Sequence, residues 1–200
     1  MTHDLHPLQP LLKPRSIAVL GASERPGSVG RRTMENLLHG GYEGPLYAVN
    51  PGYEAVRGVA CFPTLDALPE TVEHVVLTLG DANVEAGLDA VIAHGAQAAT
   101  MMSSLVLQGD APPLLRDRVS RKIVGSGLVV CGANGMGFYN FADGVWVCGF
   151  DTRSNHVRGG NVTLISHSGS GMSGIIDCDE RIDFILAVST GQELIVTMDQ

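Results

Sequence analysis

The segment Asn161 to Gly174, NVTLISHSGSGMSG, sets a histidine among serines at the end of an apolar run. A serine-hydrolase elbow needs the pattern G-x-S-x-G, and neither Ser168 nor Ser170 has glycines two residues away on both sides. Small residues between a strand and a helix instead present free N–H groups, a hydroxyl and the positive helix end to an anion. We therefore expect Ser168, Gly169 and Ser170 to bind a phosphate group, and we expect no nucleophile here.

A second chemical signal lies near the start of the chain, in IAVLGASERPGSVG. An apolar run leads into Gly21, Ala22 and Ser23, and Gly27 and Gly30 follow before a helix-type segment. Small residues in this arrangement let backbone N–H groups and a helix N-terminus approach a phosphate. Ser28 is the expected N-cap of that helix.

The sequence lacks one feature that is typical of an NAD-binding site. NAD sites place an acidic residue at the end of the second strand to bind the ribose, whereas YAVNP has Asn50 and Pro51 there. Arg25, Arg31 and Arg32 lie near the loop and can pair with additional phosphates. The pattern favours a nucleotide with several phosphates.

Alternating strand-type and helix-type segments position these loops. The strands read as continuous apolar runs, which is typical of a parallel sheet covered on both faces by helices. We expect an α/β fold with a Rossmann-like, doubly wound parallel sheet. Its expected strands are Ile17–Leu20, Leu46–Val49, His74–Leu79, Ala98–Met102 and Leu128–Cys131, and its expected helices are Val29–His39, Asn83–His94 and Pro113–Val124.

The later part of the chain changes character. Residues 46–74 carry Pro and Gly throughout and are expected to form a loop-rich connection with a short helix at Leu65–Leu68. Residues 149–160 are polar and Gly-rich, which favours a linker between a first domain, 1–148, and an incomplete second α/β domain, 161–200. That second domain is expected to begin with Val162–Ser166, Ser170–Glu180 and Phe184–Ser189.

The composition restricts the partners and the location. Thirteen basic against 21 acidic residues give a net charge of −8, which disfavours nucleic acid and anionic membranes as partners. The four cysteines are spaced without a zinc pattern, so we expect free thiols and no metal site. The first residues lack a basic region followed by an apolar stretch, and no apolar run is long enough to span a bilayer, so we expect a cytoplasmic protein.

These motifs together resemble a known family. GAS…PGSVG, YAVNP and FPTLDALPE occur in the order found in the CoA-binding domain of the NDP-forming acyl-CoA synthetases, relatives of the succinyl-CoA synthetase α subunit. The resemblance continues through VVCGANGMGFYNF and NVTLISHSGSGMSG to VSTGQE, and it covers nearly the whole chain. It implies that residues 161–200 begin a flavodoxin-like domain similar to that of succinyl-CoA synthetase.

The resemblance implies which residues bind coenzyme A and which reaction they serve. Acid, CoA and a nucleoside triphosphate give acyl-CoA, nucleoside diphosphate and phosphate through a phosphohistidine, whose phosphate lies at Ser168–Ser170. That histidine is expected downstream, so no catalytic residue is expected in this chain; His167 and His156 are expected to be hydrogen-bonded structural residues. The implied CoA-binding residues are Gly21, Ala22, Ser23, Gly27, Val29, Val49, Asn50, Pro51, Thr78, Leu79, Ser103, Ser104 and Asn134.

The chain departs from the family at the substrate end and leaves alternatives open. Ala133 and Gly135 stand where the family has Pro and Cys, and Gln192 stands at an Asn position. We expect the chain alone to bind CoA without catalysis, and to act with a small carboxylic acid, an ATP-grasp domain or subunit that binds ATP or GTP with Mg²⁺, and further copies in an oligomer. The alternatives are a CoA-sensing or protein-acetyltransferase regulatory module and an NAD(P)-binding oxidoreductase.

Overall fold

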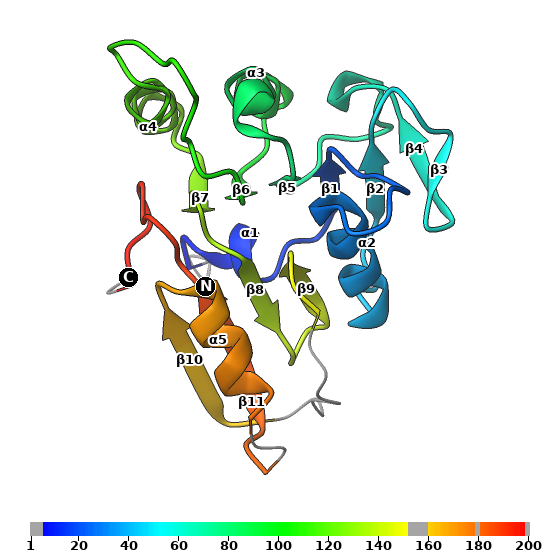
Figure 1. The fold of residues 1–200 in the computed structure, drawn as a ribbon. Helices are drawn as coiled ribbons and strands as arrows, with labels where there is room; N and C mark the ends of the chain where they lie inside the picture. Colours follow the sequence, from blue (N-terminus) through cyan, green and yellow to red (C-terminus); the bar gives the residue numbers. More distant parts are fainter. Residues whose placement is uncertain (1–5, 152–159, 179–180, 199–200) are drawn as a thin grey trace, which may run out of the picture.

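The apolar runs of the first 132 residues gather into a parallel-dominated sheet in the computed structural model, which describes residues 6–151, 160–178 and 181–198 (Figure 1). Within these residues the sheet has seven strands in the order β3-β4-β2-β1-β5-β6-β7, and only the β3–β4 pair is antiparallel. The elements are α1 Gln9–Leu12, β1 Ile17–Leu20, α2 Val29–His39, β2 Leu46–Val49, β3 Ala55–Val56, β4 Val59–Phe62, the 3₁₀ helix η1 Leu65–Ala67, β5 His74–Leu77, α3 Asp81–His94, β6 Ala98–Met101, α4 Leu115–Ser126 and β7 Val129–Gly132.

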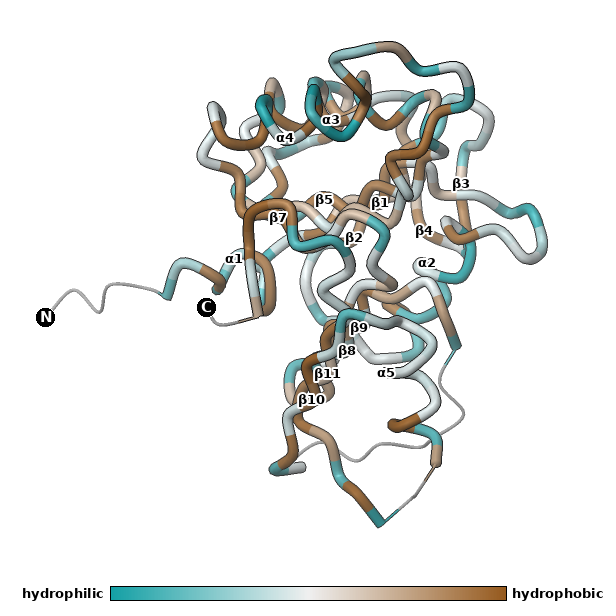
Figure 2. Tube along the Cα trace, turned by 60° about the vertical axis from the view of Figure 1, so that its left-hand side comes forward, coloured by the Kyte–Doolittle hydropathy of each residue, from teal (hydrophilic) through white to brown (hydrophobic). Residues whose placement is uncertain are grey.

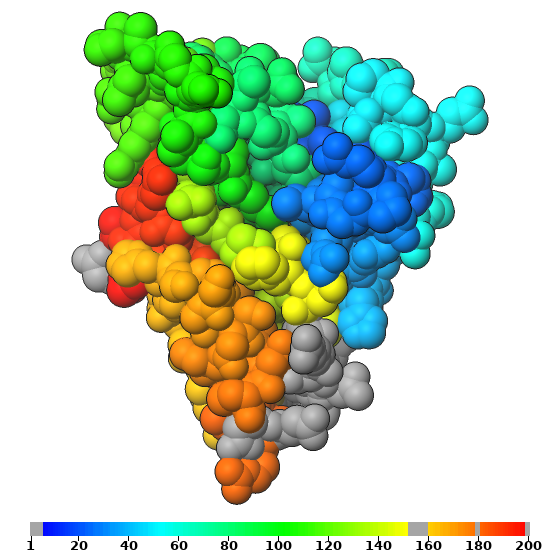
Figure 3. Space-filling model, viewed as in Figure 1, coloured from blue at the N-terminus to red at the C-terminus, as the bar shows by residue number. Residues whose placement is uncertain are grey.

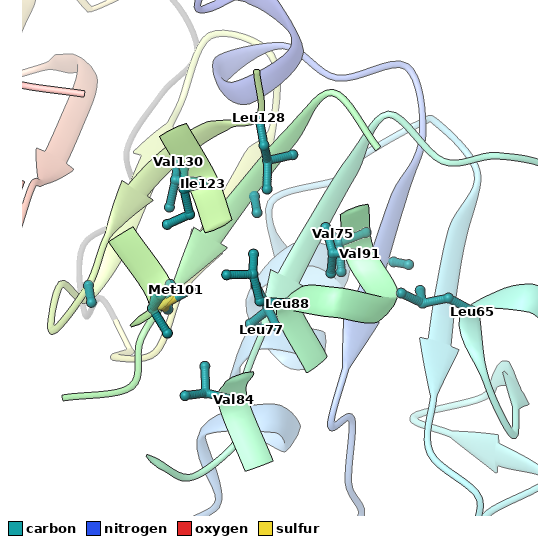
Figure 4. Packing of buried hydrophobic residues seen from close by; sticks show 14 of the residues in the cluster. Leu65, Val75, Leu77, Val84, Leu88, Val91, Met101, Ile123, Leu128 and Val130 are labelled. Atoms are coloured by element: carbon teal, nitrogen blue, oxygen red, sulfur yellow. The ribbon is translucent and has the colours of Figure 1, made fainter. Parts of the chain in front are cut away.

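Helices cover both faces of this sheet, which confirms the expected doubly wound α/β fold. α3 and α4 pack on one face, while α1 and α2 lie on the other (Figure 1). Val75 and Leu77 of β5 belong to the core under α3 and α4, whereas Val76 belongs to the core on the α2 side. Figure 4 shows Leu88 and Val91 of α3 among the side chains of the first core. Because both faces are buried, the central strands are mostly apolar along their whole length. The buried polar exceptions are His74 of β5 and Thr100 of β6, whose side chains are joined by a hydrogen bond of 3.0 Å.

A second, smaller sheet is formed by the later elements β8 Gly137–Asn140, β9 Val145–Cys148, β10 Val162–Ser166 and β11 Phe184–Ser189, with α5 Gly169–Ile176 packed against it. Its strand order is β10-β11-β8-β9, and β10 and β11 run parallel around α5. The expected β-α-β unit is therefore present. Figure 2 shows β10 and β11 coloured as apolar segments.

The two sheets share a hydrophobic core. Phe138, Val145 and Val147 of the β8–β9 hairpin pack in one cluster with Met34 and Leu37 of α2. In Figure 3 the yellow segment around residue 150 lies between the blue N-terminal part and the orange second unit. The hairpin therefore fixes the second sheet against α2.

The β8–β9 hairpin lies before the expected domain boundary at residue 148, but its hydrogen bonds join it to the second sheet. β8 pairs with β11 through Phe138 and Val188, so the β8–β9 hairpin belongs to the second sheet by its backbone partners. The domain boundaries themselves stay a prediction. Most of the expected linker, residues 152–159, lies outside the described residues.

Several element boundaries were wrong by one to four residues, and some elements were not anticipated. The largest difference is in α5, which was expected at Ser170–Glu180 and ends at Ile176. β5 ends at Leu77, and α3 begins at Asp81 after the N-cap Gly80. The connection expected to be loop-rich contains the β3–β4 hairpin, which turns at Arg57 and Gly58, both with positive φ. α1, β8 and β9 were also missed. These segments are only two to four residues long, so they carry little periodic signal of their own.

None of the helices in the described ranges has the length and apolar character that crossing a membrane requires.

Candidate functional site

The candidate site lies at the carboxyl ends of β1 and β5, which are neighbours at the point where the strand order reverses. Gly21 follows β1 with φ +95°, a conformation that glycine adopts without strain. A Cβ on Gly21 would lie 2.9 Å from Oγ1 of Thr78, which itself donates a hydrogen bond to the carbonyl oxygen of Leu20 at 3.1 Å. Open α/β sheets bind ligands at such a switch point.

The N-terminus of α2 is held closely against this strand end. A Cβ on Gly30 would lie only 2.2 Å from the carbonyl oxygen of Gly21. The hydroxyl of Ser28 accepts a hydrogen bond from the backbone N–H of Arg31 at 3.3 Å, which confirms the expected N-cap. Gly27 has φ +75° and open space around its Cα. The loop and helix therefore bring backbone N–H groups and the positive helix end to this edge.

Asn50 at the end of β2 connects the second loop to the first. Its Nδ2 donates to the carbonyl oxygen of Ala22 at 2.8 Å, and its Oδ1 accepts from the backbone N–H of Gly52 at 2.9 Å. Pro51 next to it is exposed. The amide therefore shapes the loop at the place where an NAD site would have a carboxylate for the ribose.

Ser103 and Ser104 at the end of β6 are tied to Asp81, a residue that the sequence analysis missed. The hydroxyls of Ser103 and Ser104 donate to Asp81 Oδ1 and Oδ2 at 2.9 and 2.7 Å, and the backbone N–H of Leu105 donates to Oδ1 at 2.8 Å. Desolvation by burial acts to raise the pKa of Asp81, but the hydrogen bonds together outweigh it and lower that pKa below its ordinary value. The carboxylate thus fixes the loop after β6 in position.

Asn134 after β7 lies next to this loop and next to the turn that follows β11. It is exposed with φ +51°, and its backbone N–H donates to the carbonyl oxygen of Ser103 at 2.8 Å. Gln192 donates its backbone N–H to the carbonyl oxygen of Ala133 at 2.7 Å and its Nε2 to that of Ser104 at 3.2 Å. The turn after β11 therefore closes against the carboxyl edge of the main sheet.

Some predicted residues have side chains that face the interior. Ala22 and Val49 are fully buried in the cores, and Leu79 is partly buried against the core under α3. Val29 is 40% exposed at the start of α2, and Ser23 pairs its hydroxyl with that of Tyr53 at 3.3 Å. The structure thus brings the predicted loops together at one edge, and which of their residues contact a ligand stays a prediction.

The segment Ser168–Ser170 lies at the N-terminus of α5, as expected. Ser168 is the N-cap, and its hydroxyl accepts from the backbone N–H of Gly171 at 3.1 Å. The hydroxyl of Ser166 accepts from the backbone N–H of Ser168 at 3.2 Å and donates to its carbonyl oxygen at 3.1 Å. Ser168 and Ser170 are exposed, so a ligand can reach them.

Met136 connects the two helix N-termini. A Cβ on Gly169 would lie 2.0 Å from Met136 Cγ, so α5 begins against this side chain. A Cβ on Gly149 would lie 2.9 Å from Met136 Cε and 3.3 Å from Cγ1 of Val29 at the start of α2. The two predicted anion-binding segments are therefore parts of one region of the molecule.

His167 is held at the end of β10 by the turn after β11. Its Nδ1 lies 3.2 Å from Thr190 Oγ1, 3.3 Å from the carbonyl oxygen of Gly191 and 3.3 Å from Glu193 Oε1. The expected hydrogen bonds of His167 are therefore present, and its structural role stays a prediction. His156 lies outside the described residues.

A hollow of about 580 Å³ among the described residues lies away from this edge. Arg15, Glu73, Gln97 and Leu128 line it, and these residues precede β1, β5, β6 and β7. It is therefore at the amino edge of the sheet, opposite to the edge where doubly wound folds bind ligands. Chemistry and topology, rather than size, identify the candidate site.

No group of three or more His, Cys, Asp and Glu side chains that could hold a metal ion comes together in the ranges that the structure covers.

The chain matches a known family and several known proteins. Residues 15–140 match the family described as a CoA binding domain. An acetate–CoA ligase [ADP-forming] II of Archaeoglobus fulgidus is 26% identical over 163 residues, which are 81% of this chain and 24% of that protein. An acetate–CoA ligase [ADP-forming] I of the same organism is 36% identical over 72 residues, which are 36% of this chain and 10% of that protein.

A solved structure agrees with these matches. The acetyl-coenzyme A synthetase 1 of Ca. Korarchaeum cryptofilum, described as dinucleotide forming and in complex with phosphate and ADP, has a TM-score of 0.85 and 26% identity to this chain. The alignment covers 96% of this chain and 41% of that one. The chain thus spans less than half the length of the relatives it matches.

Proposed function

The chain belongs to the CoA-binding domain family, and we propose that it is the CoA-binding part of an ADP-forming acyl-CoA synthetase. The proposal draws on relatives named as ADP-forming acetate–CoA ligases and on a synthetase structure that superimposes over nearly all of this chain. The reaction would join a carboxylic acid to CoA while ATP is converted to ADP and phosphate.

The observation that carries the proposal is the closely packed switch point. Gly30 lets α2 approach Gly21, so the loop N–H groups and the helix N-terminus meet at one place. The pyrophosphate of CoA would bind there, because these groups stabilise negative charge without any net positive charge on the protein. Asn50 and Pro51 would lie beside the adenosine end.

The pantetheine arm would then follow the carboxyl edge toward β7. Thr78, Ser103 and Ser104 line that route, and Asp81 fixes the two serines by hydrogen bonds. The thiol would end near Asn134, where the turn carrying Gln192 closes against the edge. A rigid edge of this kind lowers the ordering cost of binding a long, flexible arm.

The N-terminus of α5 would receive the phosphate that this reaction transfers. Ser168 and Ser170 are exposed, and the contacts of Met136 place them in the same region as the start of α2. The phosphorylated histidine and the ATP-grasp module with its Mg²⁺ would belong to another part of the enzyme. This chain would then supply the sites for CoA and phosphate but not the phosphate-carrying residue, and its four free thiols fit a reducing cytoplasm.

Isothermal titration calorimetry with CoA, NADH and NADPH tests the binding step. We expect CoA to bind with one site per chain and both dinucleotides to bind far more weakly. Tight binding of a dinucleotide without CoA affinity would instead identify an oxidoreductase, for which Asn50 leaves the ribose without its usual acidic partner. An activity assay separates the roles: acyl-CoA should form from acid, CoA and ATP only when an ATP-grasp partner is added.

A further inference from the structure

A cluster of four charged side chains joins the glycine loop to the β3–β4 hairpin. Arg57 lies in the hairpin turn, with φ +52°, and its backbone N–H donates to Glu24 Oε1 of the glycine loop. Arg31 on the first turn of α2 donates from Nη1 to the carbonyl oxygen of Glu24 at 2.8 Å. The hairpin, the loop and the helix therefore meet at Glu24.

Glu35 orients both guanidinium groups. Its Oε1 lies 2.9 Å from Nε of Arg31 and 3.3 Å from Nε of Arg57. One carboxylate oxygen thus holds two cations side by side, although two guanidinium groups alone would repel each other. Their Nη1 atoms are consequently both directed to the neighbourhood of Glu24.

The two guanidinium groups hold the Glu24 carboxylate less closely than they hold Glu35, although Oε1 of Glu24 also accepts the hydrogen bond from the backbone N–H of Arg57. Its Oε2 lies 4.0 Å from Nη1 of Arg31 and 3.8 Å from Nη1 of Arg57. The side chains of Glu24 and Arg57 are 38% and 39% exposed, and ion pairs of this kind contribute about 0–1 kcal/mol. A more highly charged anion can therefore displace Oε2 of Glu24 from the two guanidinium groups at small cost, while Oε1 keeps its hydrogen bond to the backbone N–H of Arg57.

The cluster is next to the expected position of the CoA ribose. Ser23, which precedes Glu24, pairs its hydroxyl with that of Tyr53, three residues beyond Asn50 at the end of β2. In doubly wound folds the ribose lies near the end of the second strand, and an arginine there accommodates a ribose phosphate when one is present. CoA carries such a phosphate monoester, at the 3′ position of its ribose, and it has nearly two negative charges at neutral pH.

We propose that Arg57 and Arg31 recognise the 3′-phosphate of the CoA ribose, and that this phosphate displaces the Glu24 carboxylate from between them. The inference rests on the proposed function, since it assigns one part of CoA to a defined part of the same site. Arginine is suited to this role because its planar group binds phosphate through two parallel hydrogen bonds. Glu35 keeps both arginines in place when Oε2 of Glu24 is displaced.

Calorimetry with CoA and with dephospho-CoA, which lacks the 3′-phosphate, tests this inference in the wild-type chain, Arg57→Gln, Glu24→Gln and Arg121→Gln. Wild type should bind CoA at least about tenfold tighter than dephospho-CoA, as expected for charge-assisted hydrogen bonds. Arg57→Gln should reduce this ratio toward one and leave the affinity for dephospho-CoA within about twofold. Glu24→Gln should increase the affinity for CoA, because it removes the competing charge and keeps an oxygen for the backbone N–H of Arg57.

Arg121→Gln is the matched control, since it makes the same change on α4 and should leave both affinities unchanged. An unchanged ratio in Arg57→Gln, or a loss of CoA affinity in Glu24→Gln, would overturn the inference. Should Arg57→Gln fail to fold, Arg57→Lys and Glu24→Gln still decide it, because lysine keeps the charge but not the planar group. Equal binding of both ligands by wild type refutes this inference alone, whereas binding of neither refutes the proposed function as well.

Discussion

Substituting Gly30 by alanine should separate the helix from the strand end that together form the candidate site. Gly30 is in the first turn of α2, where alanine would otherwise favour the helix by about 1 kcal/mol. Its Cβ, however, would lie 2.2 Å from the carbonyl oxygen of Gly21 and 3.0 Å from Oγ1 of Thr78. Ordinary contacts of a Cβ begin near 3.4 Å. α2 would therefore have to move away from β1 by about 1 Å, because a packed interior has no free space to absorb the methyl group.

Overpacking of this size costs typically about 1–3 kcal/mol, which exceeds the gain in helix propensity. We expect a net loss of about 1–2 kcal/mol in the free energy of unfolding. CoA affinity should fall by about tenfold or more, because the N–H groups that would bind the pyrophosphate move with the helix. A variant that only lost stability and kept the loop geometry would bind CoA with nearly wild-type affinity, so the loss of affinity reports the movement of the helix.

Urea unfolding and calorimetry with CoA measure the two effects. Gly125→Ala is the matched control: Gly125 is helical in α4, and a Cβ there would meet no atom within 4 Å. That variant should be as stable as wild type or slightly more stable, with unchanged CoA affinity. If Gly30→Ala also keeps wild-type stability and affinity, the close approach of α2 to Gly21 is not required for binding and the reasoning fails.

Three further outcomes follow from buried or capping groups. Burial lowers the pKa of His74 from 6.5 to about 3, and since the folded state then binds fewer protons than the unfolded state, stability is full above pH 6.5 and is lost as the pH falls toward 3. The loss should be about 2 kcal/mol at pH 5 in chemical unfolding, and it should be much smaller in His74→Gln. Asp81→Ala should cost about 1–3 kcal/mol, because it removes the acceptor of the Ser103 and Ser104 hydroxyls. With its lowered pKa, wild-type Asp81 contributes stability above its ordinary pKa that is lost only in more acidic solution, so pH-dependent unfolding below pH 4 should differ between the two proteins. Ser168→Ala should destabilise α5 by about 1 kcal/mol, measured as faster amide exchange at Gly171, whereas Ser170→Ala should leave that exchange unchanged.

Local signals in the sequence were enough for the elements around the glycine loop. β1 and α2 have the bounds that the sequence predicted, because an apolar run and the N-cap Ser28 act within a few residues of the chain. The sequence also predicted that the loops after β1, β2, β5, β6 and β7 lie on one edge of the sheet. Strands that alternate with helices form a parallel sheet, and all its carboxyl ends lie on the same edge.

The short strands could not be predicted in the same way. β3 has two residues, and β8 and β9 have four each, so their periodicity is too brief to be recognised. Their stability comes from partners distant in the sequence: β8 bonds to β11, and the β8–β9 hairpin packs against α2. A strand of this kind exists because of its neighbours rather than because of its own residues.

The sequence by itself determined which small and polar residues follow each strand, and with them the chemistry of an anion-binding edge. Only the tertiary structure decided which of these groups meet. It brought Arg57 to Glu24 across 33 residues, Asp81 to the serines after β6, and Met136 between the starts of α2 and α5. The physical reason is that strand order and helix packing set the distances between loops, and neither is written in the spacing of residues along the chain.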